Sequence, residues 1–290
     1  MAESQSCGMR GSRAGWVRSV ILTSVLLLPG VARAQTAGSD PNPGAITFTG
    51  GLDAPSVYVF RGFVQERDPK ITLSPYGDLG FALKSDEGGR TRVGVNVGVW
   101  NSLQTGSSGS AGFTEHLHYQ ENFYTTLSLG LSKGLTVGTT FTAYTSPNLM
   151  FNTVKEVSVK VAQSSRLKPY GIVGVDIGTD GADNGAKKGT YLELGVGPTL
   201  PLVGRVTLTV PVRLGMSLKD YYELSGVDHR FGYLDAGALV TLPLSGVSSS
   251  FGSWNIHGGV DVLTFGDTTR SINAGGKNKV VGLIGIGLTY

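Results

Sequence analysis

The feature that most constrains this chain is an alternation of apolar and polar residues, which recurs from about residue 45 to residue 290. Over 205–219 every even-numbered residue from 206 to 218 is apolar, and most odd-numbered ones are Arg, Thr, Ser or Lys. Successive side chains of a β-strand point to opposite faces, so this pattern predicts a strand with one apolar face. Glycine, with 44 of 290 residues, disfavours helices. The sequence therefore predicts an all-β fold.

The alternating segments number about twelve, and turns of unequal length separate them. Short connections such as 85–89 and 132–134 alternate with long polar ones such as 102–116 and 266–277. An even number of long strands, with short turns at one rim and long loops at the other, is typical of an antiparallel transmembrane up-and-down β-barrel. The expected strands are 45–61, 70–84, 90–101, 118–131, 135–145, 153–163, 169–178, 189–200, 205–219, 230–244, 253–265 and 279–290.

The face opposite the apolar one decides between a soluble and a membrane barrel. Glycines gather on it, for example Gly94, Gly98, Gly195 and Gly197, together with threonines and charged residues. Such residues would pack poorly as the core of a soluble protein. A membrane barrel instead turns its apolar face to lipid and has a polar interior, which favours the membrane barrel over a soluble sandwich.

The first 34 residues have the pattern of a cleaved signal peptide. Arginines precede the apolar run 20–28, and an Ala-Arg-Ala sequence at 32–34 follows. We expect residues 1–34 to be removed, 35–44 to form a short linker and 45–290 to form the barrel. Loss of four arginines and one glutamate would leave 20 basic and 20 acidic residues, which gives no electrostatic motive for nucleic-acid binding.

The last segment has an additional pattern. Its apolar face ends in an aromatic residue at the C-terminus, as in the signals by which outer-membrane proteins are recognised for barrel insertion. We expect this barrel-assembly signal to consist of Ile284, Ile286, Leu288 and Tyr290.

Two short motifs near the start of the expected barrel resemble a known family. They are Tyr58-Val59-Phe60-Arg61-Gly62 and Gly98-Val99-Trp100-Asn101-Ser102. Residues 45–105 resemble the TorF-type porin family of proteobacteria. The resemblance implies an outer-membrane location in a Gram-negative cell and a pore function, and it implies no catalytic residues.

The charged residues on the polar face are candidates for lining a pore. Seven are acidic and six are basic, so no strong selectivity for anions or cations follows. Alternatively, these charges pair with one another and plug a narrow barrel. The candidates are Asp53, Arg61, Asp78, Arg92, Glu156, Lys160, Asp176, Glu193, Arg205, Arg213, Lys219, Asp235 and Asp261.

Catalytic and metal-binding patterns are weak in this chain. His116 and His118 lie two residues apart, but isolated surface histidines are more common than metal ligands. A lipid-processing barrel enzyme would need a serine and a histidine on the lipid side, whereas the alternation turns His118 and His257 inward. A nucleophile-elbow motif is absent. We expect no enzymatic activity, no cofactor and no metal.

Three prolines conflict with continuous strands. Pro75, Pro198 and Pro211 lie inside expected strands, where each lacks the N–H that a barrel ladder needs. We expect bulges or displaced strand ends at these positions.

The leading hypothesis is an outer-membrane barrel that acts as a narrow channel for small polar solutes, with both mature termini in the periplasm. Its expected partners are outer-membrane lipid, the barrel-assembly machinery and those solutes. The alternatives are a plugged structural or adhesive barrel acting through its extracellular loops and, less favoured, a lipid-processing enzyme.

Overall fold

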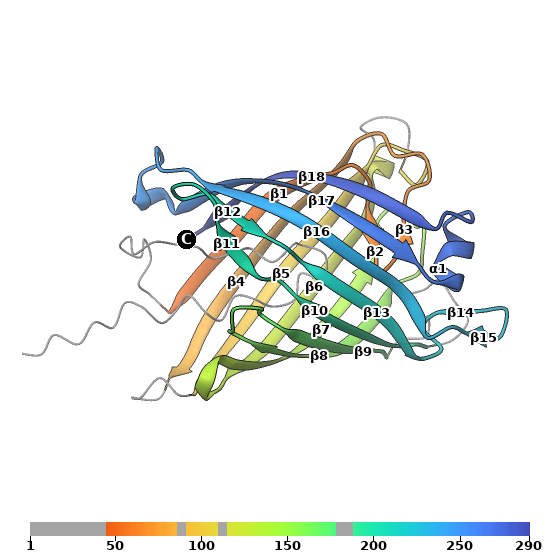
Figure 1. Ribbon diagram of the computed structural model, residues 1–290, viewed down its shortest axis with the longest axis horizontal. Coiled ribbons are helices and arrows are strands. Elements are labelled where there is room, and N and C mark those ends of the chain that lie inside the picture. Colours follow the sequence, from red (N-terminus) through yellow and green to blue (C-terminus); the bar gives the residue numbers. More distant parts are fainter. Residues whose placement is uncertain (1–44, 86–90, 110–114, 178–187) are drawn as a thin grey trace, which may run out of the picture.

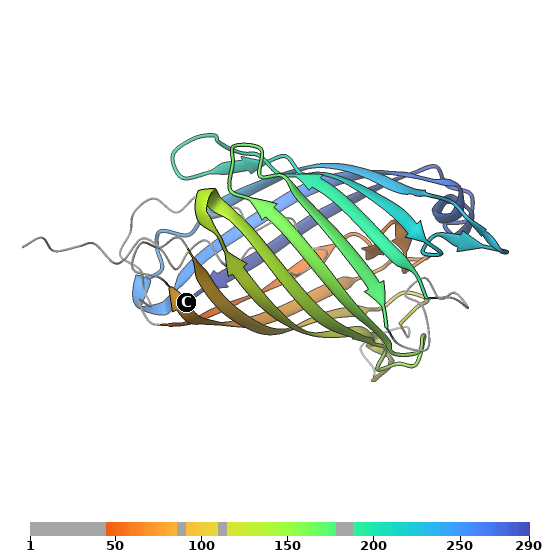
Figure 2. The same ribbon diagram turned by 90° about the horizontal axis from the view of Figure 1, so that it is seen from below.

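The computed structural model describes residues 45–85, 91–109, 115–177 and 188–290. They form a closed, antiparallel barrel of twelve strands, which confirms the predicted fold class (Figures 1 and 2). The signal-peptide and linker segments lie outside the described residues. The wall strands are β1 (Ile46–Pro55), β4 (Thr72–Ser85), β5 (Arg92–Gln104), β6 (His118–Gly130), β7 (Leu135–Thr145), β8 (Val154–Gln163), β9 (Tyr170–Asp176), β10 with β11 (Thr190–Val196, Thr199–Pro201), β12 with β13 (Thr207–Thr209, Val212–Lys219), β16 (Phe231–Pro243), β17 (Ser253–Phe265) and β18 (Asn278–Thr289).

The first and last strands close the barrel. β1 pairs with β4 on one side and with β18 on the other, in a register that places Thr49 opposite Thr289 and Pro55 opposite Leu283. Beyond the ladder, the amide of Tyr290 donates to the carbonyl of Phe48 at 2.8 Å, and the Phe48 amide donates back at 2.6 Å. The start of β1 and the end of β18 therefore meet at one rim of the barrel.

The outer wall is apolar and the inner wall is polar. Alternate residues of the wall strands are exposed hydrophobics, including Leu79, Val97, Leu127, Val159 and Ile284. The intervening positions face inward and carry Gly, Ser, Thr, Asn and charged residues. This distribution is that of a transmembrane barrel of the outer-membrane type.

Two of the three prolines divide their strands. Pro198 separates β10 from β11, and Pro211 separates β12 from β13 in the next strand of the wall. The carbonyls of both prolines still accept hydrogen bonds from the adjacent strands. The Val210 amide donates to the Pro198 carbonyl, and the Gly237 amide donates to the Pro211 carbonyl. Pro75 stays within β4, where Leu73 pairs with Leu103 and Tyr76 with Trp100 without a register shift.

The longer connections lie at the rim opposite the start of β1 and the end of β18. Among them, β14 (Glu223–Leu224) and β15 (Val227–Asp228) form a small hairpin, and α1 (Asp267–Ile272) is a single short helix (Figure 1). The described residues contain no helix that is long and apolar enough to cross a membrane.

The expected strand 45–61 is wrong in its second half. β1 ends at Pro55, and the chain then turns into the barrel as a second hairpin, β2 (Val59–Phe60) and β3 (Phe63–Val64). Arg61 and Gly62 form its two-residue turn, with φ of 47° and 84°. Positive φ at both positions is the geometry of a type I′ turn, the tight connection that suits a twisted hairpin. Residues 56–61 of the expected strand therefore belong to this hairpin and its approach, not to the wall.

Candidate functional site

The inward hairpin occupies the half of the barrel nearest α1. Val57, Tyr58, Phe60, Arg61 and Phe63 are each at most 5% exposed. β2 and β3 pair with each other and with no wall strand, so the hairpin forms a sheet of its own (Figure 1). Its interior position therefore depends on side-chain contacts.

Two aromatic clusters pack around the hairpin. One contains Val57 and Phe63 with Tyr191, Tyr221, Tyr222, Tyr233, Leu263, Phe265 and Val281. The other contains Tyr58 and Phe60 with Tyr76, Trp100, Tyr119, Tyr144 and Val154. Aromatic and aliphatic side chains thus surround the hairpin in the barrel interior, which the polar pattern of the wall strands does not predict.

Arg61 is the main polar anchor of the hairpin. Its two terminal nitrogens donate to the two carboxylate oxygens of Glu156 on β8, at 2.6 and 2.9 Å. One of them also donates to the hydroxyl of Tyr221 at 3.0 Å. The guanidinium lies 4.0 Å from the centre of the Tyr191 ring, within the range of a cation–π contact.

The backbone of the hairpin is held by residues of two loops. Asn273, just after α1, donates to the Gly62 carbonyl at 2.7 Å and accepts from the Val64 amide at 2.9 Å. The hydroxyl of Tyr222 donates to the Arg61 carbonyl at 3.0 Å. Sequence reasoning missed Asn273 and the Tyr221–Tyr222 pair; the only available signal was two adjacent tyrosines in a polar loop.

Glu66 fixes the chain that returns from the hairpin to β4. It accepts hydrogen bonds from the Ser107 hydroxyl, from the amide and hydroxyl of Ser108, and from the Asp68 amide. Burial by itself raises the pKa of Glu66, but these donors outweigh it and lower the pKa below its ordinary value. The carboxylate thus ties the segment after β3 to the loop after β5.

Several charged residues of the wall have ionic or hydrogen-bonded partners on other strands. Arg213 on β13 forms ion pairs with Asp235 and, at 3.7 Å, with Asp261. Asp53 hydrogen-bonds His257 at 2.8 Å. Asp78 accepts from Asn96 at 2.6 Å. Only Arg213 has carboxylate partners among these contacts, whereas Asp53 and Asp78 are held by hydrogen bonds from a histidine and an amide.

Glu193 has three tyrosine partners. Its carboxylate accepts hydrogen bonds from Tyr170, Tyr191 and Tyr233 at 2.6–2.8 Å. Tyr191 also stacks on Arg61, so this network extends from the wall to the hairpin.

The thirteen predicted lumen residues separate into groups. Arg61 and Glu156 form an ion pair at the hairpin. A second group lines a cavity beside the hairpin and consists of Arg213, Asp235, Asp261 and Asp53. Arg205 lies in the turn between β11 and β12, and Lys219 lies at the end of β13; both are exposed and outside these groups. The structure places Asp176 and Glu193 inside with low exposure, Arg92 half-buried on β5, and the Lys160 ammonium 4.7 Å from the centre of the Tyr170 ring.

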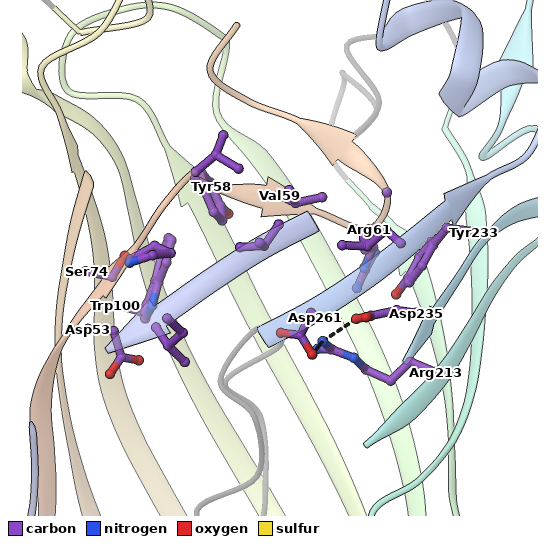
Figure 3. Close-up of a pocket in the computed structure, with 16 residues that line it drawn as sticks. Asp53, Tyr58, Val59, Arg61, Ser74, Trp100, Arg213, Tyr233, Asp235 and Asp261 are labelled. Carbon is purple, nitrogen blue, oxygen red and sulfur yellow. Dashed lines mark ion pairs between the residues drawn. The ribbon is translucent and has the colours of Figure 1, made fainter. Parts of the chain in front are cut away.

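A cavity of about 80 Å³ lies beside the hairpin. Figure 3 shows Asp53, Ser74 and Trp100 on one side of it, and Arg213, Asp235 and Asp261 on the other. The first three come from the adjacent strands β1, β4 and β5, and the second three from β13, β16 and β17. The hairpin contributes Val57, Tyr58, Val59, Arg61 and Gly62.

His118 does not share the face of Asn122 and Tyr124 as the simple alternation predicts. A bulge between Ser102 and Leu103 shifts the pairing of β5 and β6, and His118 Nε2 lies 2.9 Å from Asn101 Oδ1. Asn101 adjoins the inward Trp100 and therefore faces out. The partner of His118 is an amide oxygen, not a serine hydroxyl. The part of the chain that the structure describes holds no group of three potential metal ligands.

Comparison with known proteins yields distant structural likenesses. No family model and no curated protein matches the chain. Among solved structures, outer membrane phospholipase A from Escherichia coli has a TM-score of 0.47 and 13% identity, covering 83% of this chain and 92% of its own. OmpF of Salmonella typhi, in complex with daunomycin, has a TM-score of 0.40 and 9% identity, covering 84% and 97%.

A third similar structure is the translocator domain of the autotransporter NalP from Neisseria meningitidis. Its TM-score is 0.36, with 12% identity over 86% of this chain and 90% of that one. Likenesses this distant carry no argument about function, which has to come from the geometry of the barrel and its hairpin.

Proposed function

We propose that this protein is an outer-membrane channel for small polar solutes whose lumen is closed by the hairpin β2–β3. One observation carries the proposal: the hairpin pairs only with itself, while the wall closes independently through β1 and β18. The hairpin can therefore leave the lumen without breaking any hydrogen bond of the barrel ladder. Displacement of the hairpin would open the half of the barrel nearest α1 and expose the polar inner wall beyond it.

The proposal includes the orientation and handling of the chain. Both ends of the barrel chain lie at the rim with the short turns, which faces the periplasm in barrels with an even number of strands. We propose that the assembly machinery reads the strand ending at Tyr290 and that a cleaved leader directs export. The extracellular side then carries α1, the β14–β15 hairpin and the entrance above β2–β3.

Low charge selectivity is part of the same proposal. Two close pairs of opposite charge lie in the interior, Arg213 with Asp235 and Arg61 with Glu156. The charges cancel within each pair, and the pair still polarises a passing solute. Small neutral or weakly charged solutes fit such an interior best. Binding and passage require no chemical step, and we propose no enzymatic activity.

Single-channel recording in planar bilayers tests the proposal. The wild-type protein should show rare, brief openings, whereas Arg61→Ala should show frequent openings of uniform step size, because the hairpin loses its ion pair. Arg205→Ala is the matched control, since it removes an exposed arginine from a turn. Regular openings in the wild type equal to those of Arg61→Ala, or no steps in any variant, would contradict the proposal.

The second candidate function is a permanently plugged barrel that acts through its loops. The two aromatic clusters that enclose the hairpin favour it, because they bury Tyr58 and Phe60 almost completely. A replacement of residues 57–64 by a flexible Gly-Ser linker separates the candidates. A barrel that conducts only after this replacement, and never as Arg61→Ala, supports the plugged barrel.

A further inference from the structure

The cavity beside the hairpin has polar groups on two walls and an apolar surface between them. Leu263, Val281 and Leu283 from β17 and β18 line it between the Asp53 side and the Arg213 side. The rings of Trp100 and Tyr58, whose centroids lie 4.9 Å apart, line it next to Ser74. A pocket with an apolar surface and a few convergent polar groups is the usual form of a small-molecule site.

Seven buried polar atoms of the lining residues have no hydrogen-bond partner among the described residues. They comprise three N–H donors, two carboxylate acceptors and two hydroxyls: Arg61 Nε, Trp100 Nε1, Arg213 Nε, Asp53 Oδ2, Asp235 Oδ1, Ser74 Oγ and Tyr58 Oη. Buried polar groups in native proteins are nearly always satisfied by protein, ordered water or a ligand. Such a concentration around one cavity indicates that a polar guest belongs there.

The charges around the cavity favour an uncharged guest. Each side chain with a charge that lines it has a partner already: Arg213 pairs with Asp235 and Asp261, Arg61 pairs with Glu156, and Asp53 forms a hydrogen bond with His257. A cation would satisfy the carboxylate oxygens but face the free N–H groups of the arginines, and an anion would do the reverse. A hydroxyl group both donates and accepts, so it can satisfy either kind of atom.

The volume limits the size of the guest. About 80 Å³ is several times the roughly 10–15 Å³ that one water requires, and about half of the 150 Å³ or so in a cavity that accepts benzene. A chain of three carbons with hydroxyl groups matches this size, whereas a whole hexose exceeds it.

We propose that this cavity is a binding site for short neutral polyols of about the size of glycerol. The inference rests on the proposed channel function and specifies its substrate class: the polyol binds under the hairpin, with its hydroxyls on the Ser74 and Arg213 sides and its carbons against Val281 and Leu283. Binding itself requires only the folded barrel with its hairpin in place.

Trp100 provides a reporter within the site. The chain has three tryptophans, so Trp16→Phe with Trp254→Phe leaves Trp100 as the sole one. Glycerol should change its fluorescence saturably, while ethylammonium and propionate should not. The control protein carries Trp16→Phe with Trp100→Phe, because Trp254 hydrogen-bonds Phe251 in a turn away from the cavity. A linear change equal in both proteins, or saturation by the charged probes and not by glycerol, would overturn the proposal.

Ser74→Ala in the Trp100 reporter protein tests the position of the site. Loss of one hydrogen bond should weaken glycerol binding about two- to tenfold. Ser158→Ala, a buried serine on β8 outside the cavity lining, should leave binding unchanged. Heat-modifiable gel migration verifies folding, and Asp53→Asn replaces Ser74→Ala if the latter does not fold. Unchanged affinity in the folded cavity variant would also overturn the proposal.

Binding and conduction can fail separately. Saturable binding without any channel openings would leave the polyol site in place and contradict the channel. Rare openings of the wild type and frequent openings of Arg61→Ala, without saturable binding, would support the channel and contradict the polyol site.

Discussion

Arg61 and Glu156 are 95 positions apart in the chain, yet their side chains form a bidentate ion pair with N···O distances of 2.6 and 2.9 Å. Arg61 sits at the turn of the inward hairpin and Glu156 on the barrel wall, and both are at most 1% exposed. A buried pair of this kind adds little net stability compared with apolar residues, but it strongly disfavours any arrangement that separates the charges. The pair therefore specifies where the hairpin sits.

The first prediction concerns this pair. Arg61→Ala or Glu156→Ala should each destabilise the folded protein by about 3–5 kcal/mol, because each leaves a buried charge without a partner. The double variant Arg61→Met with Glu156→Leu should recover most of that loss. Urea unfolding in detergent measures all three. Additive losses in the double variant would show that the pair does not act as a unit.

The second prediction concerns Glu66 and pH. Its folded-state pKa is lowered, so the stability it contributes is present above the ordinary pKa of about 4.5 and disappears as pH falls through the lower, folded value. Acidification below about pH 4.5 should therefore release the segment between β3 and β4 from Ser107 and Ser108. Pepsin digestion at decreasing pH, followed by mapping of the cleavage sites, measures the release.

Glu66→Gln is the matched control for that experiment, because an amide keeps the size of the side chain but does not titrate. Its cleavage in this segment should already be high and should follow only the pH dependence of pepsin itself. Identical pH profiles for the wild type and Glu66→Gln would mean that this carboxylate does not hold the loop.

The third prediction concerns the apolar outer wall. Phe123 lies near the middle of β6 and is 50% exposed, between Val99 and Ala143 of the neighbouring strands. Phe123→Arg should destabilise the barrel by about 2–4 kcal/mol in lipid, as charges near the bilayer midplane do. Leu149 lies in the connection between β7 and β8 and is 88% exposed. Leu149→Arg should therefore leave the free energy of folding almost unchanged. Folding titrations into lipid vesicles compare the two, and equal costs would place β6 outside the membrane.

Much of the barrel follows from the sequence because a strand that separates lipid from a polar interior must alternate. β7 and β17 have the predicted bounds, and the other wall strands except β1, which ends six residues early, begin and end close to theirs. The alternation fails where the chain departs from a regular ladder. A bulge redirects His118, and the turn before β12 carries Arg205 out of the wall.

The hairpin was not predicted because its residues imitate a wall strand. Tyr58 and Phe60 continue the apolar face of β1 and Arg61 its polar face, although Val57 and Val59 interrupt the alternation. The period alone does not distinguish burial inside a barrel from exposure to lipid. The anchors Tyr222 and Asn273 come from loops, where contacts across more than 150 positions leave no periodic signal. The alternation along each strand assigned the charged residues to the polar face. Which of them pair with one another depends on the register between strands, and the alternation does not give that register.

The last prediction concerns the C-terminal residue. The main chain of Tyr290 exchanges two hydrogen bonds with Phe48 at the seam between β1 and β18, and its half-exposed ring faces outward. Deletion of Tyr290 should therefore reduce the yield of folded protein in outer membranes far more than deletion of Gly246, whose surroundings are open. Asn273 is unsuitable as a control because it anchors the hairpin.

Substitutions at Tyr290 separate the backbone from the side chain. Tyr290→Phe keeps the aromatic ring and should fold like the wild type, while Tyr290→Ala keeps only the two main-chain hydrogen bonds. An intermediate yield for Tyr290→Ala is expected if the seam and the ring at the membrane interface both contribute. Strains without periplasmic proteases and heat-modifiable migration give the folded fraction. A yield for the Tyr290 deletion equal to that of the Gly246 deletion would mean that neither the seam nor the terminal ring is needed, as expected for a frayed terminus.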